Sequence, residues 1–450
     1  MVTPTSMLKS LAALALLALA VTGPLAAQKT GGPTPSSETS IPGEAFEVKG
    51  VHVILYPSDN EIVSMIMGVE GGFASGETKN PALTEFTSDV VTSSGSGMFP
   101  KEKLRRFLSQ TSTTITGSGD YRGMSFSATT PRGTFSRVWD IMASMITDPI
   151  FDSVEFRNIR EQRIADTRRR WTNPESHASI IADSLVKLGN PTLGRYITQS
   201  DVENVTIPMM RKLMKQVAER SRVLVVVVGK VTREEVEKKL KVFTDLPGGS
   251  YRRPKIQPLK TARNPAVEVA DRSGSPTTYV YGSFAGPQAS DPDFWPLQVG
   301  LRHLRGILFE EVRTKRNLSY APGSGLSSTL GHSHGSISVS SVLPDSAIMV
   351  MLRELEKMRT GQIDEEELNN SKQVFLTGYY MRQMTNSSIA GAIYSAQRNA
   401  GDWRHAFSLD AIMRVNKGSV QRAFNKYAKN LQFGIVGNRS KVTPDKYVFR

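Results

Sequence analysis

Acidic side chains at helical spacing are the first candidates for chemistry in this chain. Glu85 and Asp89 stand four residues apart in the segment Leu83–Val91, which places both carboxylates on one face of a helix. Together with Asp166 they offer oxygen ligands of the kind that hard cations accept. Carboxylates on an exposed helix face are more commonly just solvated. The sequence therefore favours no metal at these three residues.

Histidine is scarce and cysteine is absent. The chain has six histidines and no cysteine, which excludes disulfides, zinc fingers, iron–sulfur clusters and thiol nucleophiles. No two histidines stand four residues apart. His332 and His334 are two residues apart in a Gly/Ser-rich hairpin, where a shared strand face would allow chelation. Because no third ligand is in view, we interpret both as part of a solvent-facing turn.

The elements that must position these residues occur twice. In each part a strand is followed by a helix, a hairpin, two helices and a final strand. The final strands are Val223–Gly229 and Phe433–Val436, and the second is followed directly by Gly437. The apolar run at Val223–Gly229 is typical of a strand buried on both faces. The second hairpin is predicted at Leu318–Leu326 and Gly335–Leu343. The repeat predicts an α+β chain of two homologous domains, each a mixed β-sheet packed with helices, arranged as a clam-like pair.

The N-terminal segment reads as an export signal. Leu11–Val21 is continuously apolar, too short to span a bilayer as a mature helix, and Gly23-Pro24 then breaks it. A cysteine-free exported chain suits the bacterial periplasm or the cell exterior, so we predict a periplasmic or secreted protein. Whether the signal is cleaved or kept as an anchor stays open. If it is cleaved, we expect no stable membrane insertion.

Five segments follow from length, composition and the repeat. The 450 residues, 39 % hydrophobic and 22 % charged, suffice for two or three domains. We predict a signal peptide at 1–27, a flexible tether at 28–44, an N-terminal domain at 45–246, a linker at 247–265 and a C-terminal domain at 266–450.

Basic residues outnumber acidic ones by 56 to 42, a formal net charge of +14. Many of them lie in the linker and in Arg414–Arg450, which allows a basic surface adaptor as an alternative function. Aromatic residues are not interleaved with these charges, so we expect no nucleic-acid partner. The arginines of Phe156–Arg170 alternate with Glu161 and Asp166, a pattern typical of a solvated helix face.

The segment Arg305–Tyr320 resembles the pitrilysin/insulinase family of zinc peptidases, which includes the mitochondrial processing peptidases and their bacterial relatives. In that family a helix ends in Leu-Arg-Glu-x-Arg-Gly-Leu-x-Tyr before the hairpin. The residues in register are Arg313, Arg316, Leu318 and Tyr320. The resemblance covers about residues 45–442 and implies the metallopeptidase fold of the LuxS and pitrilysin type.

The resemblance also shows which chemistry is missing. Peptide-cleaving members carry H-x-x-E-H on the first helix after the second strand, and a glutamate further along the chain completes the zinc site. In register, Glu85 and Asp89 replace the histidines, Ser88 replaces the general base, and Asp166 lies near the distal ligand. A serine cannot act as that base. We therefore expect no catalytic residue, no metal and no cofactor in this chain, and zinc only in a partner subunit.

The resemblance assigns substrate binding to Arg313 and Tyr320. In the family this pair faces the zinc site and hydrogen-bonds the peptide backbone; arginine and tyrosine supply donors for that role. By spacing alone, Arg313 would be a helix-terminal surface residue and Tyr320 a sheet residue. The resemblance implies a non-catalytic, substrate-binding subunit of a periplasmic heterodimeric zinc metallopeptidase that acts on peptides. Its partner would be a homologous subunit with intact H-x-x-E-H. An inactive peptide-binding or scaffold protein of the same fold is the alternative.

Overall fold

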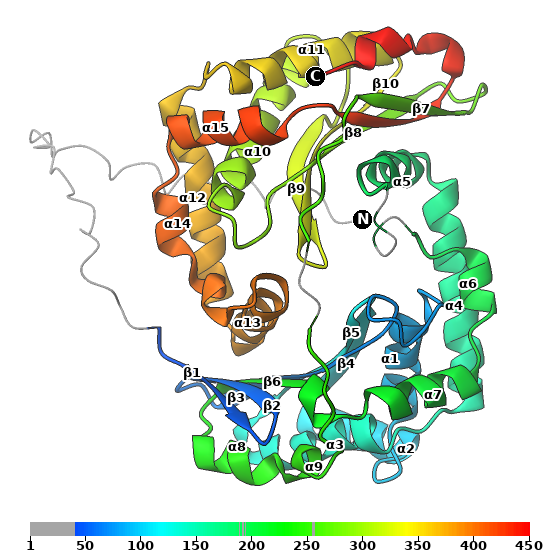
Figure 1. The fold of residues 1–450 in the computed structure, drawn as a ribbon, viewed down its shortest axis with the longest axis vertical. Helices are drawn as coiled ribbons and strands as arrows, with labels where there is room; N and C mark the ends of the chain where they lie inside the picture. The colour runs from blue at the N-terminus through cyan, green and yellow to red at the C-terminus, as the bar shows by residue number, and fades with distance from the viewer. Residues whose placement is uncertain (1–40, 189, 191–192, 194, 254–256) are drawn as a thin grey trace, which may run out of the picture. The chain divides into compact units, whose positions relative to one another are not determined.

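The computed structural model describes residues 41–188, 190, 193, 195–253 and 257–450 (Figure 1). The chain separates into a short unit, Met1–Ile41, and one large unit, Pro42–Arg450. The predicted signal peptide at 1–27, and the predicted tether as far as residue 40, lie outside the described residues. Within the described part of the chain, no helix is both long and apolar enough to cross a membrane.

The first β-sheet holds six strands in the order β1-β2-β6-β3-β5-β4. β2 and β6 run parallel, and the other neighbours are antiparallel. β6 is buried at every residue, as its apolar run predicts. Val225 and Val227 belong to the core of this half, whereas Val226 and Val228 are buried on the opposite face. The strands are β1 (Glu44–Val48), β2 (Val51–Pro57), β3 (Ile62–Glu70), β4 (Thr114–Asp120), β5 (Gly123–Pro131) and β6 (Val223–Gly229).

Helices α1 and α3 supply much of the core on one face of this sheet. Phe86 of α1 and Trp139 of α3 are fully buried there with Phe126 of β5. Asn80 shapes the turn before α1, since its Oδ1 accepts the Ala82 N–H at 2.9 Å, but the N-cap residue of the helix is Ala82 and no side chain caps it. The helices of this half are α1 (Leu83–Ser94), α2 (Lys101–Thr111), α3 (Phe135–Thr147), α4 (Ser153–Thr172), α5 (Pro174–Val186), α6 (Gln199–Glu203), α7 (Ile207–Val217), α8 (Arg233–Lys239) and α9 (Lys241–Thr244).

The second sheet repeats the first without its outermost strand. Its order is β7-β11-β8-β10-β9, with β7 and β11 parallel and the remaining pairs antiparallel. Strand by strand this equals β2-β6-β3-β5-β4, so only β1 has no counterpart. The strands are β7 (Ala266–Asp271), β8 (Thr278–Ala285), β9 (Gly323–Thr329), β10 (His332–Ser341) and β11 (Gln432–Gly437).

The helices of the second half follow the same order along the chain. α10 corresponds to α1, α11 to α3, α12 to α4 and α13 to α5. α10 continues directly into a π-helix, η3. The elements are α10 (Phe294–Leu308), η3 (Phe309–Thr314), α11 (Pro344–Arg359), α12 (Glu365–Arg382), α13 (Asn386–Ala400), α14 (Leu409–Met413) and α15 (Lys417–Tyr427). Short 3-10 turns lie at Arg132–Thr134, Arg220–Arg222, Trp403–Phe407, Arg439–Lys441 and Pro444–Tyr447.

The two halves exchange one helix each. α5, from the first half, packs on β8 and β11 of the second sheet, and α13, from the second half, packs on β3 and β6 of the first (Figure 1). Both contacts need a glycine. A Cβ at Gly434 of β11 would lie 2.2 Å from the Ala178 carbonyl oxygen, and a Cβ at Gly68 would lie 2.3 Å from the Tyr394 hydroxyl. Each sheet is therefore covered on one face by a helix from the other half.

The predicted fold class is confirmed: the chain is α+β, with two mixed sheets packed with helices. The boundaries of the two predicted domains stay a prediction. The predicted strand Leu318–Leu326 is wrong in its first residues, because β9 begins at Gly323. The Leu318 N–H donates to the Val312 carbonyl at 2.9 Å, and Pro322 has no N–H for a ladder. Leu318 is therefore hydrogen-bonded to the end of the preceding helix, and the chain enters the sheet only at Gly323.

Candidate functional site

Helix α1 carries the three altered positions of the zinc motif, and they do not share one environment. Glu85 and Asp89 are half-buried, whereas Ser88 is fully buried. The Ser88 hydroxyl donates to the carbonyl oxygen of Glu85 at 2.8 Å, a bond within its own helix. Ser88 therefore presents no base to a bound water.

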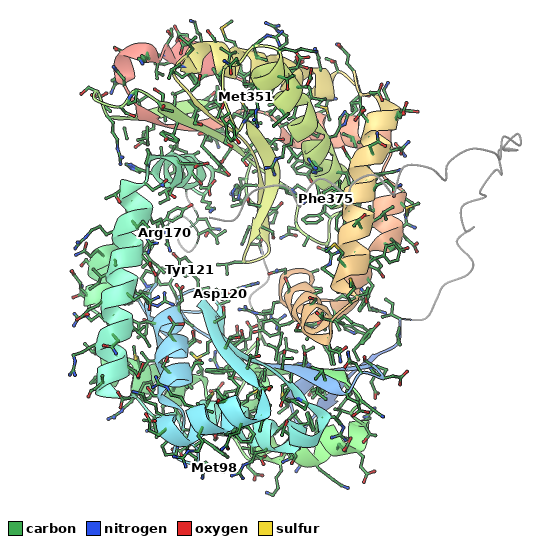
Figure 2. All side chains as sticks on the ribbon, turned by 180° about the vertical axis from the view of Figure 1, so that it is seen from behind. Met98, Asp120, Tyr121, Arg170, Met351 and Phe375 are labelled. Atoms are coloured by element: carbon green, nitrogen blue, oxygen red, sulfur yellow. The ribbon has the colours of Figure 1, made fainter. Side chains whose placement is uncertain are left out.

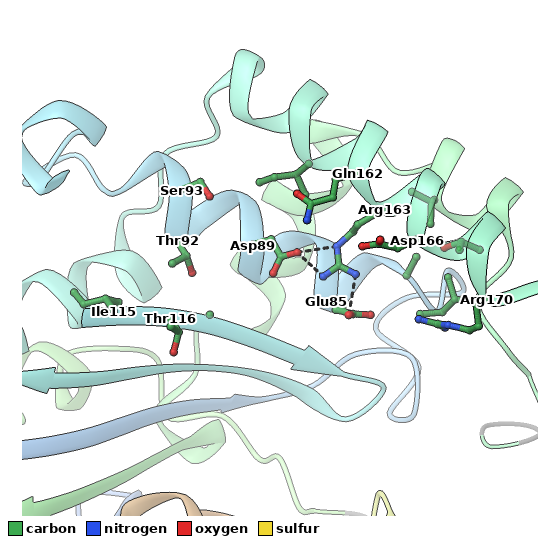
Figure 3. A pocket seen from close by; sticks show the side chains of 16 residues that line it. Glu85, Asp89, Thr92, Ser93, Ile115, Thr116, Gln162, Arg163, Asp166 and Arg170 are labelled. Carbon is green, nitrogen blue, oxygen red and sulfur yellow. Dashed lines mark hydrogen bonds and ion pairs between the residues drawn. The ribbon is translucent and has the colours of Figure 1, made fainter. Parts of the chain in front are cut away.

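The guanidinium of Arg163, from α4, lies between the two carboxylates of α1 (Figure 3). Its Nη1 stands 2.8 Å from Oε1 of Glu85. Its Nε donates to Oδ2 of Asp89 at 2.7 Å, and its Nη2 donates to the same oxygen. One arginine thus binds both residues that replace the zinc-ligating histidines.

Burial and charge act in opposite directions on this group. Burial lowers the pKa of Arg163, but the two carboxylates outweigh burial and hold that pKa above its ordinary value. Burial raises the pKa of the Asp89 carboxyl, and Arg163 opposes that rise. The Arg163 side chain is only 20 % exposed. The positive charge is therefore fixed in place by its two partners, away from bulk solvent.

Asp166 lines the same pocket, which has a volume of about 470 Å³ between α1, β4 and α4. Its carboxylate pairs with Arg169 at the helix surface, whereas Glu85 and Asp89 pair with Arg163. No histidine lines the pocket. Within the described ranges, no group of three or more His, Cys, Asp and Glu side chains could hold a metal ion.

These residues do not fit the zinc ion that the fold family implies. The carboxylates at the histidine positions already bind a guanidinium, and the residue at the base position is a buried donor. The interpretation of Phe156–Arg170 as a solvated helix face is thus wrong at Arg163. Spacing places Arg163 on the helix, but only the tertiary contact with α1 shows which way the side chain turns.

The second candidate pair lies at the end of α10. Arg313 belongs to the π-helix η3, and Tyr320 lies in the irregular segment before β9. The Arg313 guanidinium carbon stands 4.0 Å from the centre of the Tyr320 ring and 4.8 Å from the centre of the Phe309 ring. Tyr320 is 76 % exposed and Phe309 is 45 % exposed. We call these three residues the arginine stack.

The acidic residue nearest in sequence, Glu311, does not pair with Arg313 of the arginine stack. Lys315 and Arg316 both pair with Glu311, at 2.7 and 2.6 Å. No acidic side chain of the described residues pairs with Arg313. Sequence reasoning missed Phe309, although its place one helical turn before Arg313 was a usable signal. The π-helix itself is a form often found at functional sites.

The structure keeps the two candidate groups apart. Glu85, Asp89 and Asp166 line one pocket, and neither Arg313 nor Tyr320 is among its lining residues. The chain thus holds one group whose charges pair within the fold and one group without an acidic partner among the described residues, rather than a single composite site.

The interpretation of His332 and His334 as a solvent-facing turn is wrong. Both lie on β10, and His334 is buried, with Nε2 at 3.1 Å from Oδ1 of Asp183 on α5. Ser283 donates to the same carboxylate oxygen at 3.0 Å. Burial, with Arg122 and Lys187 nearby, lowers the pKa of His332 to about 4. The sequence could not show this, because the exchanged helix α5 supplies the partner.

A second buried charge cluster fastens the other exchanged helix. Arg398 of α13 binds Glu70 at 3.1 Å and both oxygens of Asp120 at 2.9 and 3.0 Å. Asp120 lies at the end of β4, beside Tyr121 (Figure 2). Burial raises the pKa of Asp120, but Arg398 and Arg122 outweigh it and hold that pKa below its usual range. The signal was an arginine at an inward position of an otherwise apolar helix face.

Comparison with known proteins agrees with this geometry. Residues 204–375 match the family model described as Peptidase M16 inactive domain. No curated protein matches the sequence significantly. Solved structures with the same fold include the following three. A peptidase M16 inactive domain from Pseudomonas fluorescens has TM-score 0.78 and 16 % identity, with 89 % of this chain and 99 % of that chain covered.

The other two are described as proteases. One, from Helicobacter pylori, has TM-score 0.73 and 15 % identity, with 88 % of this chain and 99 % of that chain covered. The other, the periplasmic protease PqqL from Escherichia coli, has TM-score 0.72 and 15 % identity, with 87 % and 45 % covered. This chain thus corresponds to about half of PqqL.

The chain is a duplicated α+β fold in which the positions of the family's zinc motif bind a guanidinium. The resemblance to the pitrilysin/insulinase family is confirmed: residues 204–375 match the M16 inactive-domain model, and the fold is that of M16 structures.

Proposed function

We propose that this chain is the non-catalytic, substrate-binding subunit of a periplasmic heterodimeric zinc peptidase that acts on peptides. Its partner is a homologous pitrilysin-like subunit with an intact H-x-x-E-H motif. That partner supplies the zinc and the base, and this chain supplies the arginine stack.

The observation that carries the proposal is the state of Arg313. Its guanidinium is held by the faces of two aromatic rings, at 4.0 and 4.8 Å, rather than by a carboxylate. Stacking occupies the faces of the guanidinium and leaves its N–H edges available. An arginine kept in one orientation with open donors is suited to bind an oxygen acceptor from another molecule.

Peptide carbonyl groups are such acceptors. The five N–H groups of arginine and the hydroxyl of an exposed tyrosine can hydrogen-bond the backbone of an extended peptide. If one donor is aimed at the carbonyl that gains negative charge during hydrolysis, it contributes on the order of 3 kcal/mol to the transition state. This is a role for the Arg313 and Tyr320 side chains that needs no metal in their own chain.

Export supports the periplasmic part of the proposal. The apolar segment Leu11–Val21 reads as a signal, and the chain has no cysteine that an oxidising compartment could cross-link. PqqL, which has the same fold, is described as a periplasmic protease.

Reconstitution with the partner tests the proposal. This chain is co-expressed with an exported homologue that carries H-x-x-E-H, and hydrolysis of a fluorogenic peptide library is measured for the purified pair. We expect activity only in the mixture. Arg313→Ala and Tyr320→Phe should each lower kcat/KM by about 100-fold, the effect of losing one well-aimed donor.

Matched variants separate this role from a general disturbance. Arg316→Ala removes a nearby exposed arginine that already pairs with Glu311, and Tyr380→Phe alters an exposed tyrosine on α12. Both should leave hydrolysis unchanged. Equal activity with and without the Arg313 and Tyr320 substitutions would refute the assigned role. Chelator-sensitive hydrolysis by this chain alone would refute its non-catalytic nature.

A further inference from the structure

The charge arrangement at Arg163 has the geometry of a small cation site. Two acidic residues four apart on α1 point their carboxylates to one positive centre, and that centre comes from a second helix. The centre is a guanidinium that uses three N–H groups, two on Asp89 and one on Glu85. A metal ion in this pocket would need the same oxygens.

We propose that Arg163 is the resident cation of this site: its guanidinium does the structural work of a metal ion and fastens α4 to α1 without one. The inference rests on contacts within this chain and does not depend on the proposed function.

Helix α4 needs such a fastening. Of its 20 residues only Thr167 is fully buried. Its first turn is held by Phe156, whose ring stacks on Phe86 of α1 at a centre-to-centre distance of 5.2 Å. Arg163 lies two turns further along, where α4 lines the pocket (Figure 3). Ile159 and Ile164 beside it pack only partly buried against the core, and the guanidinium adds a charged contact to α1 at this point.

The arrangement of the two carboxylates suits a guanidinium. A planar fork of donors matches two carboxylates that approach from one helix face. The two acids carry two negative charges and Arg163 carries one positive charge, so the guanidinium cancels one of the two negative charges and both stay uncompensated without it. Removal of the guanidinium should convert the pocket into a hard-cation site made of Glu85, Asp89 and Asp166.

Thermal unfolding of this chain alone tests the proposal. The protein, as wild type and as Arg163→Met, is melted in EDTA and in a titration of Mn²⁺, a metal that prefers oxygen ligands. We expect the wild-type Tm to be the same in both conditions. The Arg163→Met variant should melt roughly 5 °C lower in EDTA, because two half-buried carboxylates lose their counter-charge. Mn²⁺ should raise its Tm again.

Two further variants keep the test sharp. Arg169→Met removes an exposed arginine of the same helix that pairs only with Asp166, and it should change the Tm by less than roughly 1 °C. The triple variant Arg163→Met, Glu85→Gln, Asp89→Asn removes all three charges together and should recover most of the lost Tm. It also covers the case in which Arg163→Met alone fails to fold.

Four results overturn the proposal. The first two are an Arg163→Met variant as stable as Arg169→Met, and an Arg163→Met variant that Mn²⁺ does not stabilise. The third is a triple variant that stays unfolded. The fourth is a wild-type Tm that rises with Mn²⁺, where the Glu85→Gln substitution abolishes that rise. None of these measurements involves a partner or a peptide, so they leave the proposed function untouched.

Discussion

Helices α1 and α10 occupy equivalent places in the two halves, and one arginine lies beside each of them. The two arginines have different kinds of partner. At α1, Arg163 is held by two carboxylates, which take its Nε, Nη1 and Nη2. At the end of α10, Arg313 is held by two aromatic rings, and its edges are free. The same side chain is a structural tie in one half and an open donor in the other.

The difference lies in what surrounds the guanidinium. Carboxylates neutralise the charge and hold it out of solvent, so the gain goes into the fold. Aromatic faces orient the charge without neutralising it, so the remaining interaction energy stays available to a ligand. The position of an arginine in the fold thus says less about its role than the kind of partner it has.

Substitution of each arginine in turn should give the largest difference in stability between the two sites. Arg163→Met should lower the free energy of unfolding by about 3 kcal/mol, because it leaves a carboxylate pair uncompensated. Arg313→Met should lower it by less than about 1 kcal/mol, since only two stacking contacts are lost. Urea unfolding of both variants measures the two values. Similar losses at both sites would remove the distinction.

The two carboxylates of the first site should differ from each other. Asp89 accepts two N–H groups from Arg163 and Glu85 accepts one. Asp89→Asn should therefore cost about 2 kcal/mol and Glu85→Gln about 1 kcal/mol. Equilibrium unfolding of the single and double variants gives the coupling to Arg163. A reversed order would mean that Glu85 is the main partner.

A smaller effect on stability comes from His332, which the fold keeps in its neutral form. The pKa of His332 is lowered to about 4 in the folded chain, against about 6.5 when unfolded. The unfolded chain therefore binds this proton first, so stability falls as pH drops from about 6.5 to about 4. Because the side chain is only half-buried, solvent reduces this loss to about 1 kcal/mol.

The His332→Gln variant should flatten that part of the pH profile. Melting temperatures of wild type and variant, measured between pH 7 and pH 4, give the comparison. His405→Gln, at an exposed histidine, is the matched control and should leave the profile as it is. An unchanged profile in His332→Gln would place the acid sensitivity elsewhere.

The smallest expected effect is on stability at the arginine stack. Tyr320 is 76 % exposed, so Tyr320→Ala should change the free energy of unfolding by no more than about 0.5 kcal/mol. The same variant should weaken peptide binding by the reconstituted pair, as measured by fluorescence anisotropy. A large loss of stability would make Tyr320 a packing residue, and the contrast between the two sites would then be weaker.

The fold was largely readable from the sequence where elements have one apolar face. The all-buried strand β6, the helix α3 and the repeat of strand and helix order follow from hydrophobic spacing. The helices α5 and α13 were not predicted. Each covers a sheet of the other half, and a contact between parts of the chain so distant leaves no local pattern.

The same limit applies to the site. The sequence predicts Glu85, Ser88, Asp89 and the pair Arg313 and Tyr320 as site positions from a family pattern, and their roles stay a prediction. It could not show that Arg163 turns inward, since an arginine on a helix looks the same whether it meets a carboxylate or water. Phe309 was overlooked although its spacing from Arg313 was a usable signal, and the structure places its ring 4.8 Å from the guanidinium carbon.

The helix exchange has a consequence for how the protein is made. The face of the first sheet that α13 covers carries buried residues such as Val226 and Val228, and α13 ends at Ala400. A ribosome that has synthesised only the first half has produced a sheet with one face still bare. That face exposes apolar side chains to solvent until nearly the whole chain has emerged. Cutting the gene between the halves would therefore yield two insoluble fragments that need each other, rather than two independent proteins.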